Sequence, residues 1–241
     1  MRLVICLPTY NERANLEPIA RRLGDVLANV GAEARVLVID DSSPDGTGEL
    51  ADRLSGELPF LSVLHRTRKE GLGPAYIAGF RWALEHGANR IVQMDADLSH
   101  DPADVPRLLA AAEGAVLSLG SRYVEGGGTE NWGKGRQAIS RFGSFYARRI
   151  LGVPVRDLTG GFKCWRREAL EALPLDRIRT KGYAFQIETT YRALRGGFEV
   201  VEIPIVFAER RSGGSKMTRG IVLEAMWKVP ELRLRAALKR L

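Results

Sequence analysis

The segment DADLSH at positions 95–100 holds the residues best suited to chemistry in this chain. It follows RIVQM at 90–94, which is typical of a buried strand, and it precedes a helix that begins with proline. Side chains alternate along an extended segment, so Asp95 and Asp97 are expected on one side of it. Two close carboxylates can share a hard divalent cation, while diphosphate oxygens and waters complete its shell. The spacing predicts a Mg²⁺ or Mn²⁺ site there; the alternative is a loop in which Asp101 caps the helix.

A second acidic turn, DDSSPDGT at 40–47, follows another β-branched run. Its first two carboxylates, Asp40 and Asp41, are adjacent, so they repel each other and need a hydrogen-bond donor or a cation nearby. A base or a ribose hydroxyl of a nucleotide could be that donor. Asp45 and Thr47 are better explained as residues that cap the following helix.

Other familiar catalytic arrangements are missing from the sequence. The first strand runs into PTYNE at 8–12, where a dinucleotide-binding fold needs glycines, so a nicotinamide dehydrogenase is disfavoured. There is no G-x-S-x-G nucleophile motif and no Cys/His pair, and the two cysteines are expected to be structural. His65, His86 and His100 lack metal-ligand spacing. His100 is expected to face solvent; the alternative is that it touches a substrate phosphate. Covalent catalysis therefore has no visible nucleophile.

Basic residues are expected beyond the same edge of the sheet. Arg122 ends the fifth predicted strand, Arg136 follows a loop rich in glycine and tryptophan, and RRSGGSK at 210–216 resembles a flexible basic clamp that contains Arg210 and Lys216. A single arginine is usually a solvated surface charge. Three groups in loops that follow the strands favour phosphate binding.

The elements that must position these residues alternate along the chain. Strands are predicted at 3–9, 35–40, 61–65, 90–95 and 115–121, with helices at 15–29, 47–55, 74–86 and 102–113 between them. Beyond Arg122 the sequence predicts helices at 139–150 and 185–194, a short run at 161–165, and strands at 198–203 and 205–208. This alternation indicates an α/β fold with a mostly parallel central sheet flanked by helices, whose ligands bind at the carboxyl ends of the strands.

Length and composition fit one globular domain over residues 1–241, since the chain is 45% hydrophobic and 27% charged. No apolar run approaches the ~18 residues of a membrane-spanning helix, and the N-terminus reads as a strand and not as a signal peptide. A cytoplasmic protein is expected.

Charge is concentrated near the C-terminus, because residues 208–241 hold nine of the basic side chains and only three acidic ones. This asymmetry suggests a polyanionic partner such as anionic lipid or nucleic acid. Pro230 is expected to end one amphipathic helix and begin another. Their apolar positions are Val222, Ala225, Met226 and Val229 in the first helix and Leu234, Ala237, Leu238 and Leu241 in the second. These helices are expected either to dock on the chain's own core or to meet a membrane or a partner.

Taken together, the ordered motifs resemble those of the polyprenol-phosphate mannosyltransferases, including dolichol-phosphate mannose synthases, within the family-two inverting glycosyltransferases. The resemblance covers nearly the whole chain. It rests on PTYNE at 8–12, VIDDSSPDGT at 38–47, MDADLSH at 94–100, DLTGGFK at 157–163, KGYAFQ at 181–186 and a stretch from Pro204 through Arg210 to Lys216.

The resemblance implies the nucleotide-diphospho-sugar transferase fold called GT-A, with GDP-mannose as donor and a polyprenyl or dolichyl monophosphate as acceptor. By position, guanosine would be held by Pro8, Tyr10, Glu12, Ile39 and Asp41, metal and diphosphate by Asp95, Ala96 and Asp97, and phosphates by Arg122, Arg210 and Lys216. Ser99 stands where some relatives carry a glutamine that reaches the metal. Many relatives also carry transmembrane helices, so here membrane contact is expected from the chain's own surface or from a membrane-anchored partner, at the cytoplasmic face.

The mechanism follows from the charge of such an acceptor. A phosphomonoester has a second pKa of ~6, so it is largely dianionic at neutral pH and needs no general base. A sugar hydroxyl acceptor would instead need a carboxylate base such as Asp157. Direct displacement would invert the anomer and give polyprenyl phosphate β-mannose and GDP.

Three rival functions remain open on the sequence. A UDP-glucose-dependent polyprenyl-phosphate glucosyltransferase would use the same fold and mechanism. A basic nucleic-acid-binding module is motivated by the charged tail, but no recognised binding motif is present, so no nucleic acid is expected as a partner. A catalytically inactive sugar-nucleotide sensor is disfavoured by the intact carboxylate pair.

Overall fold

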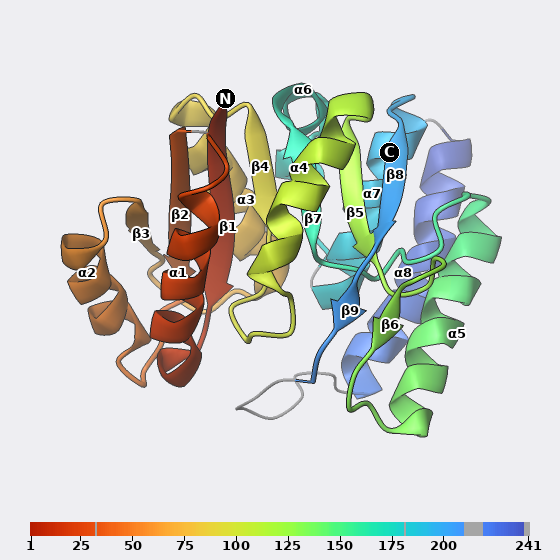
Figure 1. Cartoon of the computed structure of the whole chain (residues 1–241). Coiled ribbons are helices and arrows are strands. Elements are labelled where there is room, and N and C mark those ends of the chain that lie inside the picture. Colours follow the sequence, from red (N-terminus) through yellow and green to blue (C-terminus); the bar gives the residue numbers. More distant parts are fainter. Residues whose placement is uncertain (32, 181, 210–218, 239–241) are drawn as a thin grey trace.

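We describe a computed structural model of the chain, which covers residues 1–31, 33–180, 182–209 and 219–238 (Figure 1). Its centre is a seven-stranded sheet in the order β3-β2-β1-β4-β7-β5-β8. The strands are β1 (Arg2–Thr9), β2 (Glu33–Asp40), β3 (Leu61–His65), β4 (Arg90–Gln93), β5 (Leu117–Ser121), β7 (Lys163–Arg166) and β8 (Val200–Pro204), and a small second sheet pairs β6 (Gly128–Thr129) with β9 (Val206–Phe207). All pairings are parallel except those of β7, which runs antiparallel between β4 and β5.

The helices lie on both faces of this sheet. They are α1 (Arg13–Leu27), α2 (Thr47–Glu57), α3 (Leu72–Glu85), α4 (Val105–Gly114), α5 (Lys134–Leu151), α6 (Arg167–Ala172), α7 (Gly182–Arg195) and α8 (Arg219–Ala237), with short 3₁₀ turns η1 (Pro102–Asp104) and η2 (Leu175–Arg177). The predicted α/β class and the mostly parallel sheet are confirmed. Each predicted strand and helix of the first half has a counterpart whose ends differ by a few residues.

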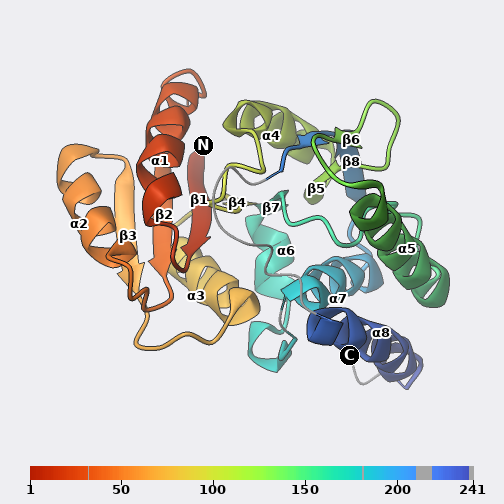
Figure 2. The same ribbon diagram turned by 90° about the horizontal axis from the view of Figure 1, so that it is seen from below.

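Three apolar clusters hold the layers together. One cluster packs α1, α2 and α4 on one face of the sheet, and a second packs α3, α6 and α7 on the other. These strands are buried on both faces, so they read as nearly continuous apolar runs. A third cluster joins α5, α7 and α8 beyond β5. Figure 2, which looks along the sheet from below, shows α1, α2 and α4 on one side of the strands and α3, α7 and α8 on the other.

The parallel strands all end at the lower edge of the sheet in Figure 1. Directly after three of them the backbone turns through the left-handed region, at Asn11 after β1, Ser42 after β2 and Leu98 after β4, where φ is 58°, 61° and 62°. Such a conformation costs on the order of 1 kcal/mol or more for a residue with a side chain, and most for leucine among these three. The acid-bearing turns are therefore held in a specific shape by the surrounding structure.

The expected division of the tail at Pro230 is wrong, because α8 continues through that residue as one helix. A proline removes the backbone donor that the carbonyl four residues earlier needs, here that of Met226. The hydroxyl of Tyr146 on α5 donates to this carbonyl at 2.9 Å. A neighbouring helix thus supplies the missing hydrogen bond, and the proline is tolerated.

The inward face of α8 also differs from the expected one. Among residues 226–238, whose side chains are described, the buried ones are Val229, Leu232 and Ala236, which pack in the cluster with α5 and α7. Met226, Leu234 and Leu238, which were expected to share the apolar face, are exposed instead. The prediction that the tail docks on the core is confirmed for α8, although a second apolar stripe remains on its outer side.

Candidate active site

A cavity of about 450 Å³ opens at the carboxyl edge of the sheet, where the acidic turns and several basic residues meet. This volume is in the range of small-molecule sites. Most residues predicted to bind a nucleotide sugar line it: Pro8, Tyr10, Glu12, Asp41, Asp95, Ala96, Asp97 and Arg122. Because these residues lie at or just after the carboxyl ends of β1, β2, β4 and β5, the parallel strands bring them together from a span of more than a hundred residues. Ligands of open α/β sheets bind at this edge.

The turn after β4 presents both predicted metal-binding carboxylates to the cavity. Asp95 Oδ1 accepts a hydrogen bond from the Tyr76 hydroxyl at 3.2 Å. The Oδ1 atom of Asp97 accepts from the backbone N–H of Ser99 at 3.1 Å and from its hydroxyl at 2.5 Å. Ser99 therefore orients Asp97, with Leu98 between them in the left-handed conformation. Ser99, where the resemblance implied a metal-reaching glutamine in some relatives, braces the second carboxylate here.

The chemistry of this donor set fits a hard divalent cation. Both carboxylates line the cavity, and Asp97 is only 3% exposed. In the part of the chain that the structure describes, no group of three or more His, Cys, Asp and Glu side chains converges as an all-protein metal site. One or two carboxylates are enough for Mg²⁺ when a ligand's diphosphate and waters supply the other oxygens. Asp95 and Asp97 are the residues that would hold such an ion.

The turn after β2 is organised by Asp41. Its Oδ2 atom accepts from the backbone N–H groups of Glu70 and Gly71 at 3.1 and 3.0 Å, and its Oδ1 atom accepts from the Arg66 guanidinium. The donors that Asp41 requires thus come from within the chain, whereas the buried Oδ1 atom of Asp40 has no hydrogen-bond partner in the described part of the chain. Asp41 fixes the loop that carries Lys69, whose ammonium lies 3.6 Å from the centre of the Tyr10 ring at the cavity.

Ile39 is the predicted nucleotide-binding residue that the structure does not bring to the cavity. Its side chain is fully buried in the cluster between the sheet and α3 and is not among the residues that line the cavity. The alternation along β2 explains this, because Ile39 points toward α3. In this position it supports the site from beneath.

Arg122 lines the cavity, but its charge is closely matched by a carboxylate. Asp157, which is fully buried, accepts from the Arg122 backbone N–H at 3.0 Å and from Nε and Nη2 at 2.7 Å each. Burial would raise the pKa of Asp157, but the Arg122 guanidinium and the other hydrogen bonds outweigh it and lower that pKa below its usual value. Asp157 is therefore an ionised partner of Arg122 and is poorly suited to act as a general base.

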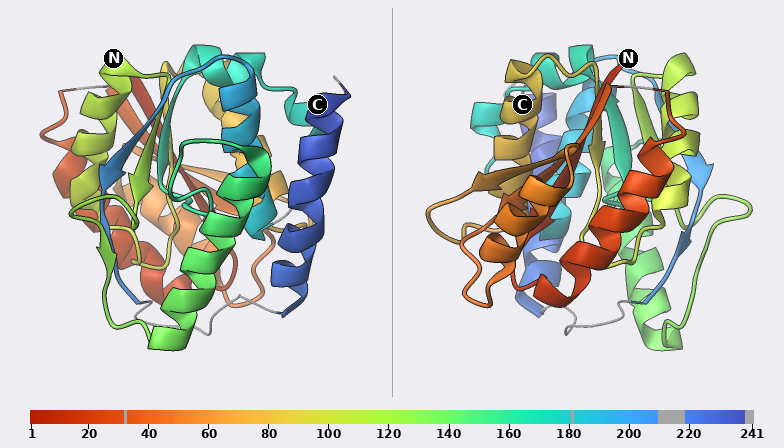
Figure 3. Two further views of the ribbon diagram at one scale, coloured as in Figure 1. Left: turned by 90° about the vertical axis from the view of Figure 1, so that its right-hand side faces the viewer. Right: turned by 60° about the vertical axis from the view of Figure 1, so that its left-hand side comes forward.

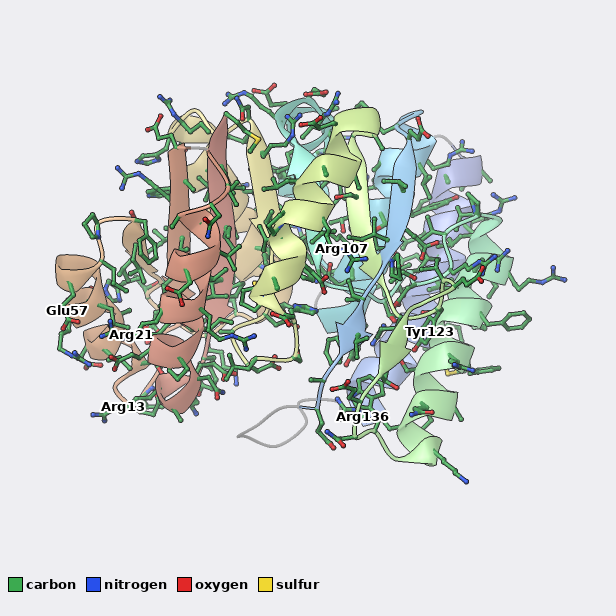
Figure 4. All side chains as sticks on the ribbon, in the orientation of Figure 1. Arg13, Arg21, Glu57, Arg107, Tyr123 and Arg136 are labelled. Atoms are coloured by element: carbon green, nitrogen blue, oxygen red, sulfur yellow. The ribbon has the colours of Figure 1, made fainter. Side chains whose placement is uncertain are left out.

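Arg136 adds a second cation at the first turn of α5. Its guanidinium stacks 3.9 Å from the centre of the Trp132 ring and pairs with Glu209 at 3.1 Å. Both Arg136 and Trp132 line the cavity. Figure 4 shows Arg136 at the lower edge of the molecule, the edge at which the parallel strands end. Arg210 and Lys216, the other predicted phosphate-binding residues, lie outside the described residues.

His100 corrects one expectation, since it is 2% exposed and does not face solvent. Its ring stacks on Phe162 with centroids 4.7 Å apart and meets Phe207 edge-on at 5.1 Å. The backbone N–H of Asp95 donates to Nδ1 at 3.1 Å, so the proton of the neutral ring lies on Nε2. The turn folds back on itself and carries this side chain inward, which the spacing of histidines along the chain could not indicate.

Sequence reasoning also missed contributors from distant segments. Lys69, Gly161 and Gln186 line the cavity, although they come from the loop before α3, the entry to β7 and the first turns of α7. Gln186 ends the KGYAFQ motif, which carries the resemblance but had no assigned role. Its position in that motif was the available signal.

Comparison with known proteins agrees with this arrangement. The glycosyl transferase family 2 profile matches residues 4–173. The undecaprenyl-phosphate mannosyltransferase of Micrococcus luteus is 50% identical over 94% of this chain and 91% of its own length. The polyprenol monophosphomannose synthase of Mycolicibacterium smegmatis is 48% identical over 99% of this chain and 89% of its own.

A solved structure supports the fold. Glucosyl-3-phosphoglycerate synthase from Mycobacterium tuberculosis, in complex with Mn²⁺, UDP-glucose and phosphoglyceric acid, superposes with a TM-score of 0.69. The alignment covers 95% of this chain and 79% of that one at 20% identity, so it speaks for the GT-A architecture alone. The resemblance seen in the sequence is confirmed, and the chain belongs to glycosyl transferase family 2, in the group of the polyprenyl-phosphate mannosyltransferases.

Proposed function

We propose that this chain transfers mannose from GDP-mannose to the phosphate of a polyprenyl or dolichyl monophosphate, releasing GDP and polyprenyl phosphate β-mannose. The observation that carries the proposal is the meeting of the Asp41 turn, the Asp95–Asp97 turn and the cations Lys69 and Arg136 in one cavity. Such a cavity offers one place for a nucleoside, one for a metal-bound diphosphate and one for an incoming phosphate. The identity of about one half to two named mannosyltransferases supports the sugar and the lipid.

A phosphate acceptor agrees with the state of Asp157. That carboxylate was the residue reserved as a base for a hydroxyl acceptor, and it is held by Arg122. A dianionic phosphate needs no base, so one of its oxygens attacks the anomeric carbon directly while the bond from that carbon to the GDP oxygen breaks. Attack opposite the leaving group inverts the anomer.

Charge repulsion is the main obstacle to this reaction. At ~5 Å and an effective dielectric constant of ~20, each pair of like unit charges costs about 3 kcal/mol. Arg136 and Lys69 have cationic groups at the cavity, and Arg122 adds hydrogen-bond donors although Asp157 balances its charge. When bound between Asp95 and Asp97, a divalent cation would neutralise the diphosphate leaving group. Arg210 and Lys216 stay proposed members of this phosphate-binding set.

The direct test incubates the protein with a panel of nucleotide sugars and short polyprenyl phosphates, with and without EDTA. We expect a mannosyl lipid phosphate from GDP-mannose alone, loss of the product in EDTA, and its return with added Mg²⁺ or Mn²⁺. Product from UDP-glucose, or equal turnover in EDTA, would overturn the proposal. A thermal-shift comparison of GDP with UDP separates the two donors independently.

Asp97→Asn tests the predicted metal ligand, with Asp101→Asn as its matched control. Both changes replace a carboxylate by an amide in the same turn, but Asp101 is half exposed and pairs with Arg22. We expect Asp97→Asn to lower transfer by about a hundred-fold or more, as for other groups that stabilise transition-state charge, and Asp101→Asn to leave it within two-fold. Equal activity of the two variants would remove Asp97 from the reaction.

We also propose that the outer faces of α5 and α8 contact an anionic bilayer, from which the lipid acceptor comes. The two helices lie side by side at one side of the molecule (Figure 3, left). Large apolar side chains are exposed along both: Ile139, Phe142 and Phe145 on α5, and Met226, Trp227, Leu234 and Leu238 at α8. Exposed Arg141, Arg148, Arg149, Arg233 and Arg235 accompany them. Apolar and basic groups on one face are typical of helices that lie at a membrane surface.

The lipid contact is testable with Trp227, one of the four tryptophans of the chain. Trp227 is 79% exposed, so the part of the emission that a Trp227→Phe variant lacks should shift to shorter wavelength on vesicles that contain phosphatidylglycerol. A Phe142→Ser, Trp227→Ser double variant should lose cosedimentation with these vesicles and keep its activity on a short soluble acceptor. Unchanged cosedimentation of the variant would refute this face. No described helix is long and apolar enough to cross a bilayer.

A further inference from the structure

A fully buried polar cluster lies next to the cavity, between the sheet and α7. Lys163 on β7 is 0% exposed, and its Nζ atom donates to Gln186 Oε1 at 2.8 Å and to the Gln186 backbone carbonyl at 3.0 Å. Gln93 on β4 joins the cluster, because its Nε2 atom donates to Gln186 Oε1 at 3.3 Å. Burying polar groups of this kind costs free energy unless they are paired, so this cluster is expected to have a role in the neighbouring cavity.

The cluster fixes which way the Gln186 amide points. The indole N–H of Trp165 can only donate, and it lies 2.6 Å from Gln93 Oε1. This contact makes Nε2 the end of Gln93 that faces Gln186, and an N–H₂ group must meet an oxygen there. Lys163 imposes the same orientation independently. The oxygen of Gln186 is therefore held inside the protein, and its N–H₂ group is turned the other way.

That N–H₂ group faces the cavity and lacks a hydrogen-bond acceptor. Gln186 lines the cavity and is 2% exposed, and its Nε2 atom has no hydrogen-bond partner within the described part of the chain. A buried donor without an acceptor costs about 1–3 kcal/mol. A ligand oxygen that meets it would remove this cost.

Gly161 keeps the space in front of the amide open. A β-carbon at this position would lie 3.2 Å from Gln186 Nε2 and 3.9 Å from Asp95 Oδ2. The space that a side chain would fill is thus bordered by a donor on one side and a carboxylate oxygen on the other. A hydroxyl seated between them accepts from the amide and donates to the carboxylate. A phosphate oxygen that carries no proton accepts from the amide but could meet Asp95 only through a bound cation.

We propose that Gln186 binds a hydroxyl of the hexose that is transferred, and that Lys163 and Gln93 are positioning residues that aim its amide. This inference rests on the proposed function and adds a sugar-specificity contact to it. In the proposed function the nucleoside is bound at the turn that carries Asp41, and the diphosphate through the cation on Asp95 and Asp97; Gln186 belongs to neither turn. Loss of the amide should therefore weaken recognition of the sugar and leave recognition of the nucleotide intact.

The test combines variants with deoxy donors. With GDP-mannose, Gln186→Met should lower kcat/KM by about ten- to a hundred-fold, the range expected when one buried hydrogen bond is lost, while the Kd for GDP stays within two-fold. A set of GDP-mannose analogues, each lacking one sugar hydroxyl, is tested with the wild type. The kcat/KM for one of these analogues should be lower than that for GDP-mannose by about ten-fold or more. The same analogue and GDP-mannose should react about equally with Gln186→Met.

Two further variants separate positioning from folding. Lys163→Met should reduce the discrimination against that analogue as Gln186→Met does. Thr190→Val is the matched control on α7, because Thr190 bonds only the Gln186 backbone carbonyl at 3.0 Å and should preserve the discrimination. If Gln186→Met melts far below the wild type, Gln186→Asn, which keeps the amide one carbon shorter, takes its place. Full discrimination in a folded Gln186 variant would overturn this inference, whereas a wild type inactive on GDP-mannose would overturn the proposed function instead.

Discussion

Replacing Asp157 with asparagine should destabilise the protein strongly, because it leaves Arg122 as a buried cation without a counter-ion. The two side chains are 5% and 0% exposed, and one carboxylate accepts three hydrogen bonds from Arg122 at 3.0, 2.7 and 2.7 Å. An asparagine of the same shape can accept through one oxygen only, and its N–H₂ group then faces an N–H of the guanidinium. Breaking a buried pair from one side costs about 3–5 kcal/mol.

For a chain of this size, 1 kcal/mol shifts Tm by roughly 2–4 °C, so Asp157→Asn should lower Tm by roughly 6–20 °C. Urea unfolding measures the free energy of unfolding, with Asp176→Asn as the matched control. Asp176 pairs with Arg81, but its side chain is 90% exposed, and such pairs contribute about 0–1 kcal/mol. A loss below about 1 kcal/mol in Asp157→Asn would refute the reasoning.

The same comparison also predicts how the stability contributed by Asp157 changes with pH. The folded pKa of Asp157 is lower than its unfolded value, so the carboxylate's contribution to stability is present above the unfolded pKa of ~3.9. This contribution is lost as the pH falls from there through the folded pKa. The stability difference between the wild type and Asp157→Asn should therefore be constant near neutral pH and shrink in acid.

Three other variants test single contacts. Tyr146→Phe should lower the free energy of unfolding by about 1 kcal/mol, since it removes the donor to the Met226 carbonyl. The loss should be smaller in a Pro230→Ala background, where the backbone N–H of residue 230 is restored. Equal losses in both backgrounds would contradict this account of α8. Lys163→Met should change how the free energy of unfolding varies with pH, because burial lowers the pKa of Lys163 to about 7. The wild type should gain stability relative to the variant as the pH rises from about 7 toward the unfolded pKa of the lysine. Parallel curves of stability against pH would argue against the lowered pKa. Arg136→Ala should raise KM for a short polyprenyl phosphate by about ten-fold while the Kd for GDP stays within two-fold, whereas Lys134→Ala in the same helix should change neither.

The acidic turns could be predicted from sequence because their signal is local. A β-branched run followed by Asp95 and Asp97 indicates a strand end, and parallel strands place such ends at one edge. The partners of these residues are not local. Asp157 meets Arg122 although the two lie 35 positions apart in the chain, and Gln186 reaches Lys163 only because β7 and α7 pack together. Pairs of this kind depend on the tertiary packing, so no regular spacing of residues in the sequence indicates them.

The tail was predicted less well for a related reason. Proline at position 230 is a local signal for a break, but Tyr146, on another helix, overrides it. The apolar periodicity of α8 was real, yet it contains two stripes. Only packing against α5 and α7 selects Val229, Leu232 and Ala236 as the inner one.

The placement of β7 also constrains the order in which the chain can fold. Strands β3, β2, β1 and β4 are adjacent in the sheet in that order. This half can therefore assemble as soon as residues 1–93 are synthesised. Strand β5 has no such option, because both of its neighbours, β7 and β8, come later in the sequence. Until β7 inserts, β5 presents two unpaired edges, which is a hazard for aggregation during synthesis. The same insertion brings Gly161 beside Asp95, so the cavity cannot be complete before that step.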